Sequence, residues 1–106
     1  MGQHSRELIF KAIDSYDLYT NSMKLVLKAL IELSINDVTI ISVLKLSALS
    51  KVSRPVAYQA LEVFEENRVV TREKRPKSKV SVFHIDPNKL NEMVERYKLQ
   101  ENMLNK

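Results

Sequence analysis

Residues 53–64 (SRPVAYQALEVF) constrain the fold of this chain more than any other stretch. Ser53 suits the N-cap of a helix, because its hydroxyl can accept a hydrogen bond from a backbone N–H group of the first turn. Pro55 follows within that turn, where the N–H that proline lacks would have no partner in the helix. The stretch therefore predicts a helix that starts at Ser53 and buries one stripe. The stripe consists of Ala57, Ala60, Leu61 and Phe64.

A shorter apolar segment precedes this helix, and a break separates the two. Residues 46–49 hold the apolar positions of a short helix, and residues 50–52 interrupt it. On the second helix Pro55, Gln59 and Glu62 fall on the side opposite the buried stripe. The pattern predicts a helix-turn-helix whose second helix packs with one face and presents the other.

Residues 46–74 resemble the DNA-binding core of winged helix-turn-helix transcription regulators. In these proteins the second helix, called the recognition helix, enters the major groove of DNA, and a β-hairpin called the wing follows it. The resemblance extends from about residue 37 to residue 85 and implies both the fold and DNA binding. The matching positions are Leu46, Ser50, Val52, Ser53, Arg54, Tyr58, Leu61, Val69 and Val70.

Two positions depart from the family's pattern. Lys51 stands where the family usually has glycine in the turn, and Asn67 where it usually has glycine at the end of the recognition helix. Asparagine tolerates the left-handed conformation, so Asn67 can replace that glycine. A positive φ at Lys51 costs roughly 1 kcal/mol. Either the turn carries this cost or its geometry differs slightly from that of the family.

Segments rich in β-branched residues predict a small sheet around this core. Residues 38–41 (VTII) predict a short first strand, and Ser42 then suits the N-cap of the first helix of the motif. Residues 69–74 and 79–85 predict the two strands of a hairpin with residues 75–78 at its tip. This hairpin is the predicted wing.

Additional helices are predicted at both ends of the chain. Residues 5–19 place apolar side chains at helical spacing, and a second helix starts with Thr20 or Asn21 as its cap. The dipeptide Asp86-Pro87 is a strong start for a last helix. Since the wing already completes the core, we expect this last helix to find little to pack against within its own chain.

These elements predict a mostly α-helical protein with a small β-hairpin wing, in the α+β class. The 106 residues are enough for a single core, so residues 1–106 are predicted to form one winged helix-turn-helix domain. Within it we expect N-terminal helices over residues 5–34, the helix-turn-helix and wing over 38–85, and a C-terminal helix over 87–104.

Composition excludes several other classes. The chain has no cysteine, and its two histidines have no grouping of acidic residues at metal or triad spacing around them, so no metal, cofactor or catalytic site is expected. No apolar run is long enough for a membrane span, and the N-terminus lacks the apolar stretch of a signal peptide. The sequence therefore predicts a cytoplasmic protein that is not an enzyme.

The recognition helix supplies the first predicted contacts with DNA. Arg54 can bind guanine or a phosphate, and Gln59 can bind adenine through its amide. The alternative is that Ser53 serves only as the helix cap and that Tyr58 only covers the edge of the core. The predicted DNA-binding residues of this helix are Ser53, Arg54, Pro55, Val56, Tyr58 and Gln59.

The wing supplies the second set. Residues 68–79 contain six Lys or Arg and one Glu, which gives +5, so with a net charge of +4 the rest of the chain carries −1. Such a hairpin can reach the DNA backbone or the minor groove, and its alternative is a solvated charged loop. The predicted DNA-binding residues of the wing are Arg72, Lys74, Arg75, Lys77 and Lys79.

The terminal helices are the predicted interface of a homodimer. Their apolar stripes could belong to the intrachain core or to contacts with a second copy, and regulators of this size commonly dimerise through such helices. A two-fold dimer would place two recognition helices about one turn of DNA apart. The predicted interface residues are Leu8, Ile9, Leu90, Met93, Val94 and Tyr97.

Three functions are compatible with the sequence. The first is sequence-specific binding of double-stranded DNA by a homodimer that acts as a repressor-like regulator. The second is a centromere-binding adaptor of a plasmid or phage partition system, which coats DNA repeats and recruits a filament-forming NTPase. The third is a winged helix used only as a protein-interaction module, which the basic wing disfavours.

Overall fold

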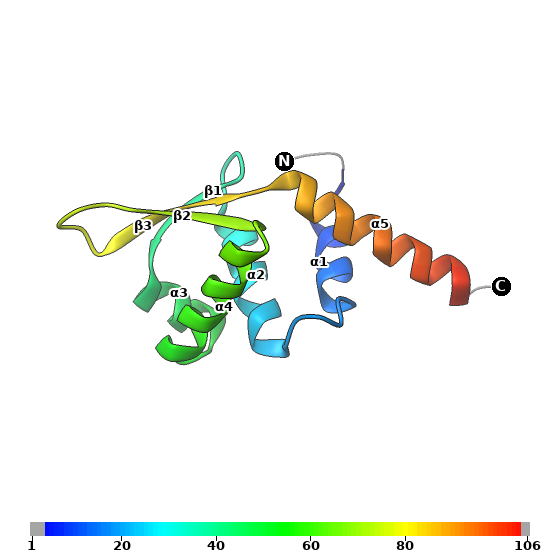
Figure 1. The fold of residues 1–106 in the computed structure, drawn as a ribbon, viewed down its shortest axis with the longest axis horizontal. Helices are drawn as coiled ribbons and strands as arrows, with labels where there is room; N and C mark the ends of the chain where they lie inside the picture. The colour runs from blue at the N-terminus through cyan, green and yellow to red at the C-terminus, as the bar shows by residue number, and fades with distance from the viewer. Residues whose placement is uncertain (1–3, 105–106) are drawn as a thin grey trace.

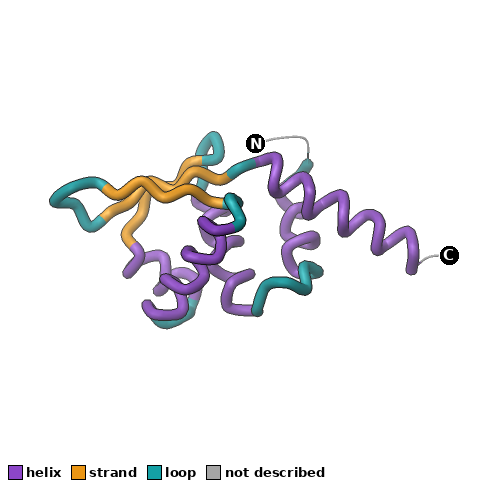
Figure 2. Tube along the Cα trace, in the orientation of Figure 1, coloured by secondary structure: helices purple, strands orange, loops and turns teal. Residues whose placement is uncertain are grey.

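The computed structural model describes residues 4–104, which form five helices and one three-stranded sheet. Figures 1 and 2 show the sheet along one side of the molecule, with helices packed beneath it and the last helix leading away from it. The elements are α1 (Arg6–Asp14), α2 (Asn21–Leu33), β1 (Val38–Ser42), α3 (Val43–Ser50), α4 (Arg54–Glu66), β2 (Val70–Lys74), β3 (Val80–Ile85) and α5 (Pro87–Leu104).

A hydroxyl side chain caps the N-terminus of each of the first four helices. In every case it accepts a hydrogen bond from the backbone N–H three residues later, which satisfies a donor that the helix itself cannot pair. Ser42 and Ser53 accept at 3.1 and 3.3 Å and confirm the two caps predicted for the helix-turn-helix. Ser5 and Thr20 both accept at 3.2 Å, so Thr20, not Asn21, is the cap of α2.

The sheet is antiparallel, with β3 between β1 and β2. Val82, near the middle of β3, has Ile40 of β1 on one side and Glu73 of β2 on the other. The three predicted strands are confirmed with small shifts at their ends, since β2 starts at Val70 and β3 at Val80. The hairpin of β2 and β3 is the wing, and its tip extends beyond the helices (Figure 1).

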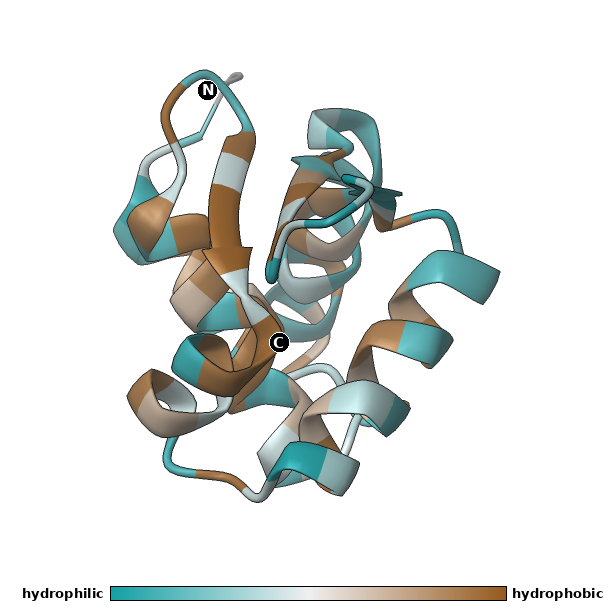
Figure 3. Cartoon of the chain, turned by 90° about the vertical axis from the view of Figure 1, so that its left-hand side faces the viewer, coloured by the Kyte–Doolittle hydropathy of each residue, from teal (hydrophilic) through white to brown (hydrophobic). Residues whose placement is uncertain are grey.

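The core lies between the sheet and the helices α2, α3 and α4. Phe64 of α4 and Phe83 of β3 are fully buried in it, together with Leu30 of α2. Thr39 of β1, itself buried, donates its hydroxyl to the carbonyl of Leu30 at 2.7 Å. This hydrogen bond attaches the edge strand to the central helix and leaves no buried polar atom unpaired at the contact. In Figure 3 the helices carry both hydrophobic and hydrophilic segments, as helices with one buried face do.

The first helix is shorter than the sequence predicts. It ends at Asp14, not at residue 19, and a turn follows that contains Tyr16 and Tyr19. Lys24 of α2 donates to the backbone carbonyl of Asp14 at 2.8 Å, which pairs one of the free acceptors at the helix end. The two tyrosines therefore lie on a link between α1 and α2 and not on a helical stripe.

The prediction that α5 has little to pack against in its own chain is wrong. Its first half packs on α1, and Leu90 and Val94 are 1% and 0% exposed while Ile9 of α1 is 2% exposed. Arg96 of α5 donates to the carboxylate of Asp17 at 3.2 Å, which adds a polar contact to the α1–α2 link. The terminal helices thus extend the hydrophobic core that the sheet and the other helices share.

The turns before and after α4 show how the chain accommodates Lys51 and Asn67, the two residues that stand where the family usually has glycine. Lys51 is left-handed, with φ 60° and ψ 39°, so the tight turn is kept at the cost of a non-glycine residue with positive φ. Asn67 has φ −85°, and the residue with positive φ after α4 is Arg68, at 60°. The expectation that Asn67 takes the glycine's conformation is therefore wrong by one residue.

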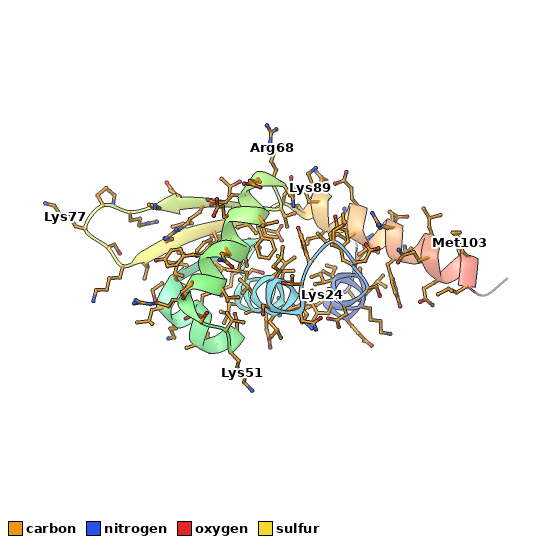
Figure 4. The ribbon with its side chains drawn as sticks, turned by 60° about the horizontal axis from the view of Figure 1, so that its bottom comes forward. Lys24, Lys51, Arg68, Lys77, Lys89 and Met103 are labelled. Atoms are coloured by element: carbon orange, nitrogen blue, oxygen red, sulfur yellow. The ribbon has the colours of Figure 1, made fainter. Side chains whose placement is uncertain are left out.

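The order and packing of these elements form a winged helix-turn-helix. Helices α3 and α4 are the two helices of the motif, α4 stands at the position called the recognition helix in such folds, and β1 pairs with the wing as predicted. The wing tip and the end of α5 lie at opposite ends of the long axis, which Figure 4 marks with Lys77 and Met103. The fold class predicted from sequence is confirmed.

Candidate nucleic-acid interface

The N-terminal half of α4 is open to solvent along the side that faces away from the core. Arg54, Pro55 and Gln59 are exposed, Tyr58 is 49% exposed, and Val56 is half-buried. The apolar stripe that starts at Ala57 is buried on the other side. The side chains predicted to contact DNA are therefore accessible on this helix, and a different set of side chains fills the core.

The Ser53 hydroxyl caps α4. This is the role that the alternative to DNA contact gave it. Its oxygen accepts from the Val56 N–H at 3.3 Å. A serine hydroxyl has one proton to donate as well as lone pairs to accept with, so the capping bond leaves its donor free. Ser53 is exposed, and this proton can reach an acceptor outside the protein.

Arg72 lies back on the protein, unlike the rest of the predicted wing residues. Its Nε donates to the Ser81 hydroxyl at 3.0 Å, and its guanidinium carbon lies 5.7 Å from the centroid of the Tyr58 ring and 5.8 Å from that of Phe83. Both distances are within the range of cation–π attraction. Arg72 thus connects the wing strand β2 to the exposed side of the recognition helix.

The cations of the wing tip are exposed and unpaired. Within residues 4–104, no carboxylate lies within 4 Å of the ammonium or guanidinium groups of Lys74, Arg75, Lys77 or Lys79. Lys77 has φ 61°, and its side chain extends from the outermost point of the hairpin (Figure 4). The tip therefore concentrates positive charge that no neighbouring residue neutralises.

A cleft of about 410 Å³ lies where the starts of α3 and α4 face the wing. We call it the cationic cleft, because three of its lining residues are basic and none is acidic. The recognition helix contributes Arg54 and Tyr58, and the wing contributes Arg72 and Lys79. The fold thus brings together four of the residues that the sequence predicts to bind DNA.

Sequence reasoning missed the contribution of other segments to this cleft. Ser42 and Leu44, at the start of α3, and Ser78 of the wing tip also line it, and Leu44 is 60% exposed. An exposed leucine in the first turn of a helix has no pattern that marks it as part of a site. Only the packing of α3 beside the wing shows that Leu44 faces this cleft.

Most of the predicted dimer residues are buried within the single chain. Ile9, Leu90, Met93 and Val94 all belong to the core between α1 and α5, while Leu8 and Tyr97 are half-buried against it. Buried side chains have no area left to offer to a second copy. The apolar residues that remain exposed on α5 are Leu99, Met103 and Leu104.

Residues 4–104 contain neither a candidate metal site nor a candidate membrane-spanning helix. Among residues 4–104 no three His, Asp or Glu side chains gather where they could hold a metal ion. None of the helices in that range is both long and apolar enough for a membrane crossing.

Comparison with known proteins agrees with the fold. The sequence matches no protein-family model and none of the curated proteins. Among solved structures, the chain is similar to a possible transcriptional regulator from Methanosarcina mazei Go1, with a TM-score of 0.58 and 15% identity over 93% of this chain and 81% of that one.

A second solved structure is also similar. It is a protein of unknown function from Listeria innocua Clip11262, with a TM-score of 0.51 and 20% identity over 85% of this chain. The match spans 63% of that protein, which is less than two thirds of its length. At such identities the likeness concerns the fold alone, and the function has to be argued from the side chains.

Proposed function

We propose that this protein binds double-stranded DNA sequence-specifically, as a homodimeric, repressor-like transcription regulator without catalytic activity. The observation that carries the proposal is the cationic cleft, where Arg54 of the recognition helix lies beside Arg72 and Lys79 of the wing with no acidic residue between them. A surface with this charge and this shape fits the phosphate backbone at the edge of a major groove. The fold, which is similar to that of a possible transcriptional regulator, is compatible with this proposal.

The exposed start of α4 supplies the contacts that read sequence. With its N-terminal half in the major groove, Arg54 binds the O6 and N7 atoms of guanine or a phosphate, and Gln59 pairs its amide with adenine. Pro55 and Val56 offer small apolar surfaces to the methyl group of thymine. Ser53 and Tyr58 donate to phosphates on either side and fix the register of the helix.

The wing supplies affinity that does not depend on sequence. Lys74, Arg75, Lys77 and Lys79 displace counterions from the backbone, and an arginine at the tip can enter the minor groove. Arg72 has a positioning role, because its contact with the Tyr58 ring holds the wing against the recognition helix, while its hydrogen bond to Ser81 fixes the arginine within the wing. The two halves of the interface are therefore presented to DNA as one rigid surface.

The dimer contact that we propose is the exposed end of α5 rather than the α1–α5 contact expected from sequence. Leu99 and Met103 are four residues apart and so lie on one face of the helix, while Leu104 lies about 100° further round it. Pairing of two such ends about a two-fold axis buries these side chains and repeats the recognition helix along the DNA.

The test is a selection of bound fragments from the genome of the protein's own host, followed by footprinting of the selected fragments over a range of protein concentration. A single short palindrome protected near a promoter is the result we expect. An array of repeats that fills cooperatively would instead favour a partition adaptor, whose expected partner is a filament-forming NTPase. Absence of any enriched sequence would overturn the proposal and indicate a protein-interaction module.

A further inference from the structure

A second pocket, of about 390 Å³, opens on a different part of the molecule from the cationic cleft and shares no lining residue with it. It lies where the α1–α2 link, the end of α4 and the first half of α5 meet. Figure 4 places Lys89, at the start of α5, beside the turn after α4 that carries Arg68. We call it the tyrosine pocket, after Tyr16 and Tyr19 in its wall. Its volume is within the range of sites that hold small organic molecules.

The wall of the tyrosine pocket is aromatic and firmly held. The rings of Tyr16 and Tyr19 pack edge to face, with centroids 4.7 Å apart and planes at 66°. Tyr19 in turn packs on the fully buried Phe64, with centroids 5.3 Å apart. Met93 of α5, 6% exposed, adds a polarisable thioether. These groups form a preformed surface on which a flat ring can pack.

One buried donor in this wall lacks a partner. Tyr19 is 5% exposed, and its hydroxyl makes no hydrogen bond of good geometry within residues 4–104. The Asn67 side chain lies close enough to act as a donor toward the oxygen, which leaves the hydroxyl proton without an acceptor. Burial raises the pKa of Tyr19, an effect that the nearby Asn67 amide partly opposes, so the hydroxyl keeps its proton at neutral pH. A buried donor without an acceptor is costly. An acceptor atom on a bound molecule would remove that cost.

Two basic side chains line the pocket, and each has a single carboxylate neighbour. Lys89 lies 3.5 Å from the carboxylate of Glu92, and Arg96 lies 3.2 Å from that of Asp17. The Arg96 guanidinium also lies 5.5 Å from the centroid of the Tyr16 ring. Lys89 and Arg96 retain donors beyond these single contacts, because an ammonium has three and a guanidinium five. Lys89 and Arg96 are balanced by Glu92 in the lining and by Asp17 beside it, so the local charge sums to zero and it is the spare donors that are available to a ligand.

We propose that the tyrosine pocket is a binding site for a small aromatic carboxylate. The ring packs against Tyr16 and Met93, and the carboxylate accepts hydrogen bonds from Lys89 and Arg96. An acceptor on the ligand takes the free proton of the Tyr19 hydroxyl. Because no residue of the cationic cleft takes part, this binding is independent of the proposed function, and it can be measured without DNA.

The direct test is a titration of the protein with benzoate and 2-naphthoate, followed by NMR of the Met93 methyl group and the Asn67 side-chain amide. Saturating shifts confined to residues of the tyrosine pocket are the expected result. Benzamide and 2-naphthamide, which keep the ring but lack the charge, should bind at least about tenfold more weakly, since charge-assisted hydrogen bonds are the stronger kind. Equal binding of acids and amides would overturn the assignment to an anion, and shifts spread over other surfaces, or none, would overturn the site.

Matched variants separate the site from a general effect of charge. Lys89→Ala should weaken binding of the acids by about tenfold. Lys98→Ala is the control, because Lys98 lies on the same helix and makes a similar contact to Glu95 at 3.7 Å, but is not in the pocket. Tyr19→Phe, which removes only the hydroxyl, should weaken binding a few-fold. If Lys98→Ala weakens binding as much as Lys89→Ala, the carboxylate is not held at this pocket.

Discussion

The wing and the second half of α5 both project from the body of the protein, at opposite ends of a molecule 54 Å long, and they expose opposite kinds of side chain. The wing tip exposes Lys77 and its basic neighbours, none of which has an ionic partner within residues 4–104. The end of α5 exposes Leu99, Met103 and Leu104, which are 64%, 75% and 79% exposed.

The difference between these two ends indicates two different partners. Unpaired cations on a narrow hairpin gain most from a polyanion, which releases counterions when they bind. Clustered apolar side chains gain most from contact with another apolar surface, because burial removes them from water. We therefore propose DNA as the partner of one end and a second copy of the chain as the partner of the other, and each proposal can be tested separately.

The largest effect is expected in the free energy of unfolding, and it distinguishes the buried first half of α5 from its exposed second half. Leu90→Ala should lower the free energy of unfolding by about 2–5 kcal/mol, because Leu90 is fully buried against α1 and its truncation leaves a cavity. Leu99→Ala is the matched change on the exposed half and should cost less than about 0.5 kcal/mol in the monomer. Urea denaturation at low protein concentration measures both. Similar losses for the two variants would show that the whole helix is intrachain core.

The second largest effect is expected in the affinity for DNA, and it tests whether α4 reads sequence while the wing binds the backbone. Arg54→Ala should cost about 1–3 kcal/mol on the selected sequence and much less on random DNA, because a base contact is lost. Lys77→Ala should weaken binding to both DNAs alike and reduce the slope of log affinity against log salt by about one. Fluorescence anisotropy at several salt concentrations measures these values. Identical behaviour of the two variants would contradict the separation of α4 from the wing.

A moderate effect is expected at the opposite end. Met103→Glu should raise the dissociation constant of the dimer by about tenfold or more, because it places two charges in a contact that is apolar in the original protein. Glu101→Gln is the control on an exposed neighbouring position. Analytical ultracentrifugation gives the constants, and DNA binding by the isolated monomer should persist at higher concentration. Unchanged association of Met103→Glu would remove the end of α5 from the dimer contact.

The smallest effect separates backbone conformation from charge at the wing tip. Lys77 has φ 61°, which costs a non-glycine residue up to about 1 kcal/mol, so Lys77→Gly should leave the fold equally stable or slightly more stable. DNA affinity should nevertheless fall as much as for Lys77→Ala. Lys74→Gly, which places glycine within strand β2, should lower stability and serves as the comparison. Retained DNA affinity in Lys77→Gly would mean that this lysine does not contact the backbone.

The elements that the sequence predicted best are those fixed by local chemistry. Ser42 and Ser53 cap the two helices of the motif because a hydroxyl at that position pairs a free N–H wherever the helix lies. Pro55 fits the first turn of α4 for an equally local reason. The exposed face of α4 followed in turn, because the spacing of its apolar residues determines which side is buried.

The predictions that failed depended on tertiary contacts. The stripe that contains Leu90 and Val94 is apolar whether its partner is α1 or a second copy, and sequence spacing does not distinguish the two. The glycine-like turn after α4 moved from Asn67 to Arg68, since the exact end of a helix depends on the packing of the strand that follows. The sequence does not distinguish Arg72 from the other basic residues of the wing, because its contact with Tyr58 depends on how the wing packs beside α4.

The assignment of the two ends is tested most directly by NMR of the backbone amides as the selected DNA duplex is added. We predict that the largest shifts occur in residues 53–59 of α4 and residues 72–79 of the wing, while residues 99–104 keep the shifts of the free protein. Shifts concentrated at the end of α5, with α4 and the wing unchanged, would contradict the assignment of DNA to the cationic end.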